Sequence, residues 1–149
     1  MRKLNHHDLG IGFPPGWLDD SVVSLTGPPR EGYSPSITIT REELESEISA
    51  AEYAANQLRE LEEGAVGIEY RLHGDEPFPL PIAGVTAHRR LQAFFIAEMG
   101  LEVMQMQVYV VKGFEAVTIT CTDTAGQFAA TKATFLEAVR MFTWQDMEG

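Results

Sequence analysis

The sequence predicts an α+β domain in which an antiparallel β-sheet, largely a meander, is flanked by two main helices. Most of the chain alternates apolar and polar residues at the period of a half-buried strand, in segments joined mainly by short turns. Two other segments place apolar residues at helical spacing behind a capping signal. The stretch 101–122, LEVMQMQVYVVKGFEAVTITCT, has two long alternating arms around Gly113, so we expect it to be the central hairpin of the sheet.

Length and composition indicate one soluble domain. The chain has 149 residues, 44% of them hydrophobic and 22% charged, which is typical of a globular domain with one core. We expect a single domain over 1–149, with residues 1–10 mobile. The formal net charge of -11 repels phosphate backbones and anionic lipid surfaces, so nucleic acid is excluded as the expected partner.

The expected location is the cytoplasm. The start of the chain, MRKLNHHDLGIGF, lacks the apolar run of a signal peptide, and no stretch approaches the roughly 20 apolar residues of a membrane span, so direct membrane insertion is not expected. The single cysteine, Cys121, lies in an apolar-patterned strand and is predicted to be a buried, inert thiol.

The first half of the chain predicts three strands and a helix. We expect a short strand at 11–13, a second at 21–26 and a third at 36–40, the second and third being separated by the proline-rich loop GPPREGYSP. Ser49 and Glu52 have the spacing of a capping box, and the helix that they open ends before Gly64.

The second half predicts four strands and a second helix. We expect a strand at 66–73, a loop GDEPFPLP, and a long strand from 83 to 99 with a bulge or two buried faces near Phe94. The hairpin of 101–122 follows. Thr124 and Gln127 suggest a second capping box, opening a helix whose apolar stripe must lie on the sheet; the stripe consists of Phe128, Phe135, Leu136, Val139 and Phe142.

Catalytic and metal-binding patterns are weak. His6, His7 and Asp8 resemble a metal-binding fragment, but in a terminal segment they are best interpreted as solvated. His73 is interpreted as a strand-end residue, and alternation sends the side chains of the run from His88 to Arg90 to opposite faces, which weakens an anion site. No nucleophile motif, phosphate loop or zinc spacing occurs, so the sequence predicts neither an enzyme nor a cofactor.

One surface pattern indicates a partner. A row of uncharged polar residues falls on the non-core parity of three predicted strands: Thr38, Thr40, Gln105, Gln107, Thr118 and Thr120. An ordinary solvated face explains such a row, because threonine is favoured in exposed strands. A protein this acidic nevertheless places almost no charge there, and such a face suits a peptide or helix whose polar groups need hydrogen bonds.

The chain resembles the DcrB-like family, which has the PsbP-like fold, a curved antiparallel sheet with flanking helices. The resemblance rests on GFPPGWLDDSVVSL, SITITREEL, AAEYAANQLREL, VMQMQVYVVKGFEAVTITCT and FLEAVRMF, and covers about 12–142. Within the family the chain is most similar to Eag-type chaperones. These cytoplasmic dimers shield the apolar N-terminal helices of type VI secretion effectors, often Rhs toxins.

The resemblance implies a non-enzymatic chaperone or adaptor that forms a homodimer and binds an apolar or transmembrane segment of a secreted toxin effector. The positions to which a partner would bind, from the resemblance and the polar row together, are Val23, Leu25, Ser36, Ile37, Thr38, Ile39, Thr40, Gln57, Gln105, Gln107, Thr118 and Thr120. Either parity, the isoleucine set or the threonine set, can line the groove. The alternative is a small-molecule or metal-binding module of the same fold, suggested by His88.

Overall fold

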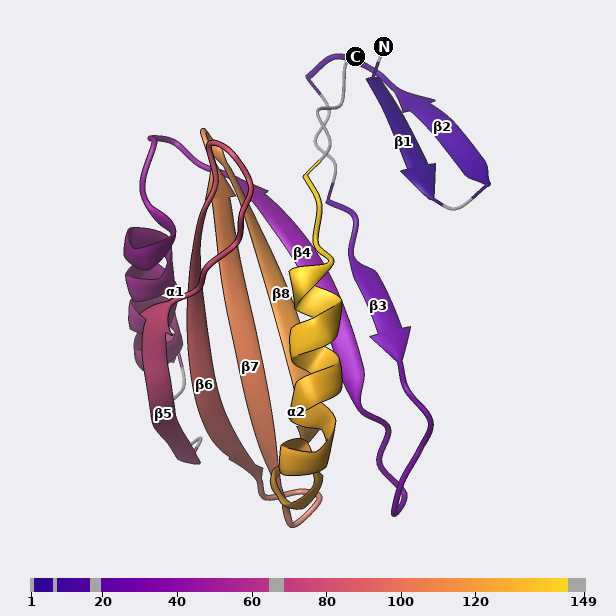
Figure 1. Ribbon diagram of the computed structural model, residues 1–149, viewed down its shortest axis with the longest axis vertical. Coiled ribbons are helices and arrows are strands. Elements are labelled where there is room, and N and C mark those ends of the chain that lie inside the picture. The colour runs from indigo at the N-terminus through magenta and orange to yellow at the C-terminus, as the bar shows by residue number, and fades with distance from the viewer. Residues whose placement is uncertain (1, 7, 17–19, 65–68, 145–149) are drawn as a thin grey trace.

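The computed structural model describes residues 2–6, 8–16, 20–64 and 69–144. Eight strands and two helices follow one another along this part of the chain (Figure 1). Their bounds are β1 Arg2–His6, β2 Leu9–Phe13, β3 Val23–Thr26, β4 Ser36–Glu43, α1 Ala50–Gly64, β5 Glu69–Pro77, β6 Thr86–Ile96, β7 Leu101–Lys112, β8 Glu115–Thr124 and α2 Ala125–Arg140. The fold class is therefore α+β, as predicted.

Six of the strands form one antiparallel sheet in the order β3-β4-β8-β7-β6-β5 (Figure 1). Strands β5 to β8 make a meander, and the β3–β4 hairpin pairs with the outer side of β8. The hairpin β7–β8 thus supplies the two central strands, which confirms the prediction for 101–122. Its turn contains Gly113 at φ +58°, a conformation that glycine adopts without strain.

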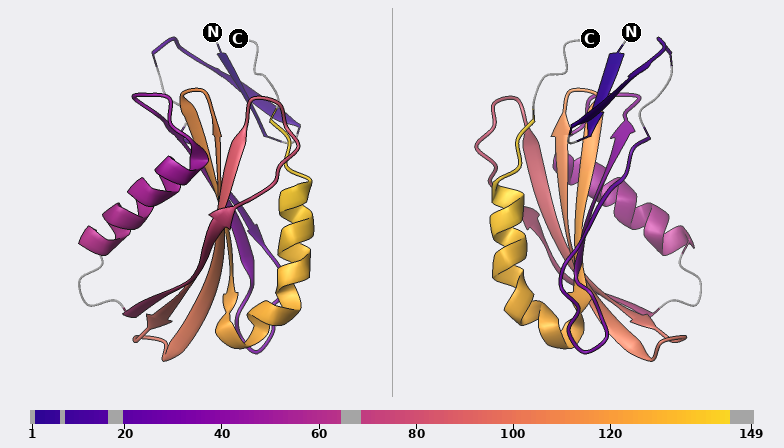
Figure 2. Two further views of the ribbon diagram at one scale, coloured as in Figure 1. Left: turned by 60° about the vertical axis from the view of Figure 1, so that its left-hand side comes forward. Right: turned by 90° about the vertical axis from the view of Figure 1, so that its right-hand side faces the viewer.

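The two helices lie on opposite faces of the sheet (Figure 2). We call these the α1 face and the α2 face. The α2 helix packs on β7 and β8, whereas α1 packs on β6 and β7. Because successive residues of a strand point to opposite faces, each strand contributes alternate side chains to each face.

The α2 face carries the larger core. Its buried residues are Phe78, which follows β5, and residues from both central strands and from the stripe of α2 that the sequence predicts: Met106, Val108, Val110, Val117, Ile119, Cys121, Phe128, Phe135 and Val139. Leu136 and Phe142 pack against them. The smaller core under α1 consists of Ala50, Tyr53, Ala54, Tyr109, Val111 and Ala116.

The two helix starts differ from one another. The Glu52 amide donates to Ser49 Oγ (3.1 Å) and the Ser49 hydroxyl donates to the Glu52 carboxylate (3.4 Å), so Ser49 caps α1 as predicted. Thr124 occupies the N-cap position of α2, but its side chain makes no capping hydrogen bond. The predicted second capping box is wrong. The Asp123 carboxylate instead accepts from the Thr124 amide (2.7 Å), because β8 brings Asp123 to the helix start.

Several boundaries also correct the prediction. Strand β1 was not expected, since its RKLNH sequence lacks an apolar alternation, yet it pairs with β2 through a short local turn. Strand β5 continues to Pro77, so His73 is not a strand-end residue but lies at a register shift between Leu72 and Gly74. This irregularity belongs to β5, whereas β6 keeps a regular register with β7 through Phe94.

The helices themselves are short. Among the described residues, no helix has both the length and the apolar character needed to cross a lipid bilayer. The predicted strand residues 66–68 lie outside the described part of the chain.

Candidate partner-binding face

Strand register brings the predicted polar residues together on the α1 face. One row runs across all six strands, because each of its residues is the register partner of the next: Ser24, Thr38, Thr120, Gln107, Arg90 and Asp75. The adjacent row contains Thr26, Ser36, Thr122, Gln105, Gln92 and Leu72. Thr40 and Thr118 pair with each other in the next row. We call this set the polar rows.

The helix residue of the predicted site lies above this face. Gln57 is one turn after the buried Tyr53 on α1 and is itself half-buried. Since residues four apart share one side of a helix, Gln57 lies on the side of α1 that faces the sheet. The structure therefore places Gln57 and the threonine and glutamine residues on one face.

The apolar half of the predicted site lies on the other face. Val23 pairs with Ile39 and Leu25 pairs with Ile37, and all four share the parity of the α2 core. Ile37 and Ile39 are half-buried, and Leu25 is 52% exposed. We call these four residues the apolar shelf. A single partner that lies on one face cannot contact both the shelf and the polar rows.

A hydrogen-bond network joins the glutamines of the polar rows. The Gln92 side-chain amide donates to Gln107 Oε1 (2.9 Å) and is 3.3 Å from Gln105 Oε1. The Gln107 amide donates to Thr120 Oγ1 (3.2 Å). The Tyr109 hydroxyl donates to the same Gln107 oxygen (2.6 Å). Gln107 therefore has both its donor and its acceptor engaged, and its orientation is set by three strands.

A buried cation lies at the covered end of this network. Arg90 is 1% exposed, and its Nη2 donates to the Ala54 carbonyl oxygen of α1 (2.8 Å). Its Nη1 donates to the Tyr109 hydroxyl (3.1 Å), and its guanidinium carbon is 5.3 Å from the centre of the Tyr109 ring. Asp75 Oδ2 is 3.4 Å from Nη2, which supplies the counter-charge. Arg90 thus ties α1 to the sheet through the helix backbone.

His88 lies beside this cation. His88 and Arg90 share the α1 face because they are two residues apart on β6, while Arg89 points to the opposite face and pairs with Glu76. His88 Nε2 contacts the other oxygen of Asp75. The run 88–90 is thus divided between the two faces, as alternation predicts, with Arg89 opposite His88 and Arg90.

Burial controls the ionisation of the aromatic hydroxyls on this face. Burial raises the pKa of Tyr109 to about 12, against the opposing effect of the Arg90 charge. Burial, together with the hydrogen bond from its hydroxyl to Glu42 (2.6 Å), also raises the pKa of Tyr53. Both groups remain neutral at physiological pH, so the face acts through hydrogen bonds more than through charge.

The polar rows are covered at β6 and become more accessible toward β3, while Asp75 and Leu72 at the β5 end are also exposed. Gln92 is 2% exposed beneath α1, Gln105, Gln107, Thr120 and Thr38 are half-buried, and Ser24 is exposed. This gradient arises because α1 packs mainly on β6 and β7, whereas on β4 and β8 it reaches Glu42 and Ala116 beyond the end of the polar rows. The accessible part of the face therefore lies over β3, β4 and β8.

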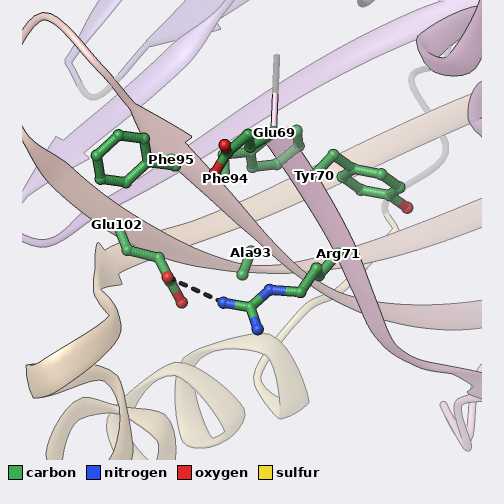
Figure 3. Close-up of a pocket in the computed structure, with 7 residues that line it drawn as sticks. All are labelled: Glu69, Tyr70, Arg71, Ala93, Phe94, Phe95 and Glu102. Carbon is green, nitrogen blue, oxygen red and sulfur yellow. Dashed lines mark hydrogen bonds and ion pairs between the residues drawn. The ribbon is translucent and has the colours of Figure 1, made fainter.

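Two hollows of similar volume lie near the two edge strands, β5 and β3. One, of about 460 Å³, is lined by Glu69, Tyr70, Arg71, Ala93, Phe94, Phe95 and Glu102 (Figure 3). The Arg71–Glu102 ion pair (3.1 Å) bridges β5 and β7 on the side of Ala93, which is 2% exposed. The other, of about 450 Å³, lies between α2 and the β3–β4 hairpin. In the described part of the chain, no three His, Cys, Asp or Glu side chains gather as metal ligands.

Sequence reasoning missed the buried members of the site, Arg90, Gln92 and Tyr109, and also the partly exposed Asp75 that pairs with Arg90. Their signal was present in part, since Arg90 and Gln92 alternate with Leu91 and Ala93 along one strand. Identifying them requires the register of β6 against β7, which places Arg90 opposite Gln107. The sequence alone does not determine which residues of β6 lie opposite which residues of β7.

The overall architecture defines a PsbP-like α+β protein. The chain superposes on a protein of unknown function from Pseudomonas aeruginosa, described as a candidate regulator, with a TM-score of 0.80 and 18% identity over 97% of this chain and 96% of that one. It also superposes on the cyanobacterial PsbP protein of Synechocystis, with a TM-score of 0.59 and 10% identity over 91% and 99% of the two chains. At these identities the similarity establishes the fold.

Sequence comparison gives the family. A profile of the DcrB family matches residues 9–140, and the chain therefore belongs to that family. Among curated proteins, none matches the sequence. The predicted DcrB-like and PsbP-like assignment is thus confirmed.

Proposed function

We propose that this protein is a non-enzymatic chaperone or adaptor that binds an apolar or transmembrane helix of a secreted toxin effector on its α1 face. The effector class is the type VI, Rhs-type class that the sequence resemblance implies, and the proposed complex forms in the cytoplasm with the chaperone as a homodimer. The observation that carries the proposal is the set of three polar rows, whose named members include only two charged residues, Arg90 and Asp75.

Uncharged hydrogen-bonding groups fit such a partner. An apolar helix leaves no surface charge to be neutralised, so a face with unpaired charges would lose free energy when the helix excludes water from it. Membrane helices also carry small polar residues at their packing faces, and these need partners when they leave water. Gln105 and the threonines supply side-chain hydrogen-bonding groups, and the threonines add methyl groups for packing.

Because α1 covers part of the polar rows, the effector helix can contact only the remaining part. Arg90 and Gln92 are enclosed beneath α1, so the proposed contact surface is the accessible part over β8, β4 and β3. Gln57 on α1 forms one wall of this surface. The apolar shelf lies on the opposite face and is excluded from the same contact.

Co-expression tests the proposal. An effector fragment that contains its apolar N-terminal helix is expressed with and without this protein, and its soluble fraction is measured. We expect this protein to raise the soluble fraction and the pair to co-purify. Replacing both Gln105 and Gln107 by lysine should abolish the gain, because two charges would be buried against the helix.

A matched control separates binding from folding. Arg71→Gln changes an exposed residue on the opposite face and should leave the soluble fraction unchanged. The thermal unfolding midpoint of each variant is measured alongside. An effector fragment whose solubility does not respond to the wild-type protein contradicts the proposal.

A further inference from the structure

The two edges of the main sheet differ in how they are protected. Strand β5 at one edge has the sequence EYRLHGDEP, with four acidic or basic side chains besides His73, a register shift in its middle and a proline at its end. Charges, bulges and prolines are the features that stop an edge from pairing with another strand. Strand β3 at the other edge has the sequence VSLT, with no charge, no proline and no register shift.

The pairing geometry of β3 shows which backbone groups point outward. The Gly27 amide donates to the Pro35 carbonyl (2.8 Å), so this pair is a hydrogen-bonded pair of the β3–β4 ladder. Hydrogen-bonded pairs recur every second residue, and Leu25 and Val23 therefore bond to β4. The amide and carbonyl groups of Ser24 and Thr26 consequently point to the open edge, where the described part of the sheet has no further strand.

An apolar surface continues from this edge. Leu25, a member of the apolar shelf, is 52% exposed. The hollow of about 450 Å³ continues this surface to α2, with Pro28, Ile37, Ala130 and Phe135 among the residues that line it. A strand added beside β3 would direct alternate side chains toward this side of the sheet.

The charge of the hollow indicates what the added strand carries. Its lining includes no acidic residue, although the chain has a net charge of -11, and its one charged member is Arg30. The Arg30 side chain is 46% exposed, and its contacts to Thr131 (2.5 Å) and Asp123 (3.5 Å) both use Nη2. The remaining N–H groups of the Arg30 guanidinium can donate hydrogen bonds to a carboxylate of the partner.

We propose that the edge of β3 binds an extended, mainly apolar segment of a partner protein, which adds to the six-stranded sheet as a further strand and places a carboxylate beside Arg30. Its backbone pairs with the outward groups of Ser24 and Thr26, and its inner side chains contact the shelf. The segment uses only the backbone of Ser24 and Thr26 and contacts side chains of the α2 face, so the inference does not rest on the proposed binding of a helix by the side chains of the polar rows.

A synthetic peptide tests this edge directly. The probe is a fluorescein-labelled peptide of about seven residues that alternates valine and threonine and ends in glutamate. We expect a saturable rise in fluorescence anisotropy with the wild-type protein. A copy N-methylated on alternate amides keeps its side chains but loses backbone donors, and should bind about tenfold more weakly. A copy with glutamine in place of glutamate should bind about fivefold more weakly.

Two substitutions of Ser24 provide a test variant and its matched control. Ser24→Pro removes an outward amide without touching the bonds to β4, and should weaken binding about tenfold. Ser24→Ala keeps that amide and should bind as the wild type does. The far-ultraviolet circular dichroism spectra of both variants are compared with that of the wild type to check that they fold. Arg71→Gln, a substitution in the opposite edge strand β5, should bind the peptide as the wild type does.

Three outcomes would overturn the proposal. The first is the lack of saturable binding to the wild-type protein. The second is equal affinity for the N-methylated peptide or for Ser24→Pro. The third is sedimentation showing a dimer that Ser24→Pro converts to a monomer, since this would assign the edge to a second copy of the chain.

Discussion

The two faces of the β7–β8 hairpin are built from alternate residues of the same strands, yet they stabilise the protein in different ways. On the α2 face, Met106, Val108 and Val110 are 0% exposed and carry no hydrogen-bonding side-chain group other than a thioether. On the α1 face, Tyr109 is as well buried at 1% but donates to Gln107 and accepts from Arg90. The first face depends on filled volume and the second on paired polar groups.

This difference predicts how each face responds to substitution. Removing volume from the α2 face leaves a cavity, and its cost grows with the size of the group removed. Removing one polar group from the α1 face leaves its partners buried without hydrogen bonds, so the cost depends on how many partners it had.

The largest effect is expected on the α2 face. Phe135 is 2% exposed and its ring centre is 5.9 Å from that of Phe128. Phe135→Ala should lower the free energy of unfolding by about 3–5 kcal/mol, measured by urea denaturation. Met141→Ala, at a residue 76% exposed, is the control and should change it by less than about 0.5 kcal/mol. A small loss at Phe135 would show that α2 is not the main cover of the core.

A smaller but still large effect is expected at the buried cation. Arg90→Met keeps much of the side-chain volume but removes the donors to the Ala54 carbonyl and to Tyr109. The expected loss is about 2–3 kcal/mol, since Asp75 is partly exposed and can be rehydrated. Hydrogen exchange of the α1 amides should also accelerate. Unchanged exchange in α1 would contradict the role of Arg90 as its anchor.

Gln107→Met tests the polar rows without removing volume. Gln107 accepts from Tyr109 and Gln92 and donates to Thr120, so its loss leaves three groups with one partner fewer. The unfolding free energy should fall by about 1–2 kcal/mol in chemical denaturation. The comparison variant is Thr40→Val on the same face, where the side chain is exposed and the expected change is below about 0.5 kcal/mol. A neutral Gln107→Met would mean that the network adds no net stability.

The thiol of Cys121 gives the smallest effect. Burial on the α2 face raises its pKa from the usual 9.0 to about 12. Above pH 9.0 the thiol loses its proton in the unfolded chain but keeps it in the folded chain, which favours unfolding. The contribution of the thiol to the free energy of unfolding is therefore complete below pH 9.0 and is lost as the pH rises toward about 12. The unfolding free energy should therefore fall less steeply above pH 9.0 in Cys121→Ala than in the wild type. Parallel pH profiles would contradict this account.

Local patterns predicted the fold well. Alternation identified the strands of the main sheet, and the stripe from Phe128 to Val139 correctly identified the buried side of α2. The same alternation separated Gln105 and Gln107 from Met104 and Met106, and the structure places them on opposite faces. These predictions succeeded because they depend on residues close together in the sequence.

Long-range pairing was not predictable in the same way. The sequence placed the threonines and glutamines on one parity but left open whether the isoleucine set or the threonine set lines a groove, because a groove depends on how the strands pair and where the helices pack. The anchor Arg90 was also missed, since its contacts come from α1, β5 and β7. The register shift in β5 could not be located from the alternation of residues either, because it depends on how β5 pairs with β6.

The central claim is that the effector helix binds on the α1 face and not on the α2 face, and adjacent residues of β4 test it most directly. Thr38 points to the α1 face and Ile39 to the α2 face, and both are half-buried. A photo-crosslinking benzoylphenylalanine is placed at either position, and the protein is co-expressed with a toxin effector that has an apolar N-terminal helix. The account predicts a crosslink to that helix from position 38 and none from position 39. A crosslink from position 39 alone would contradict it.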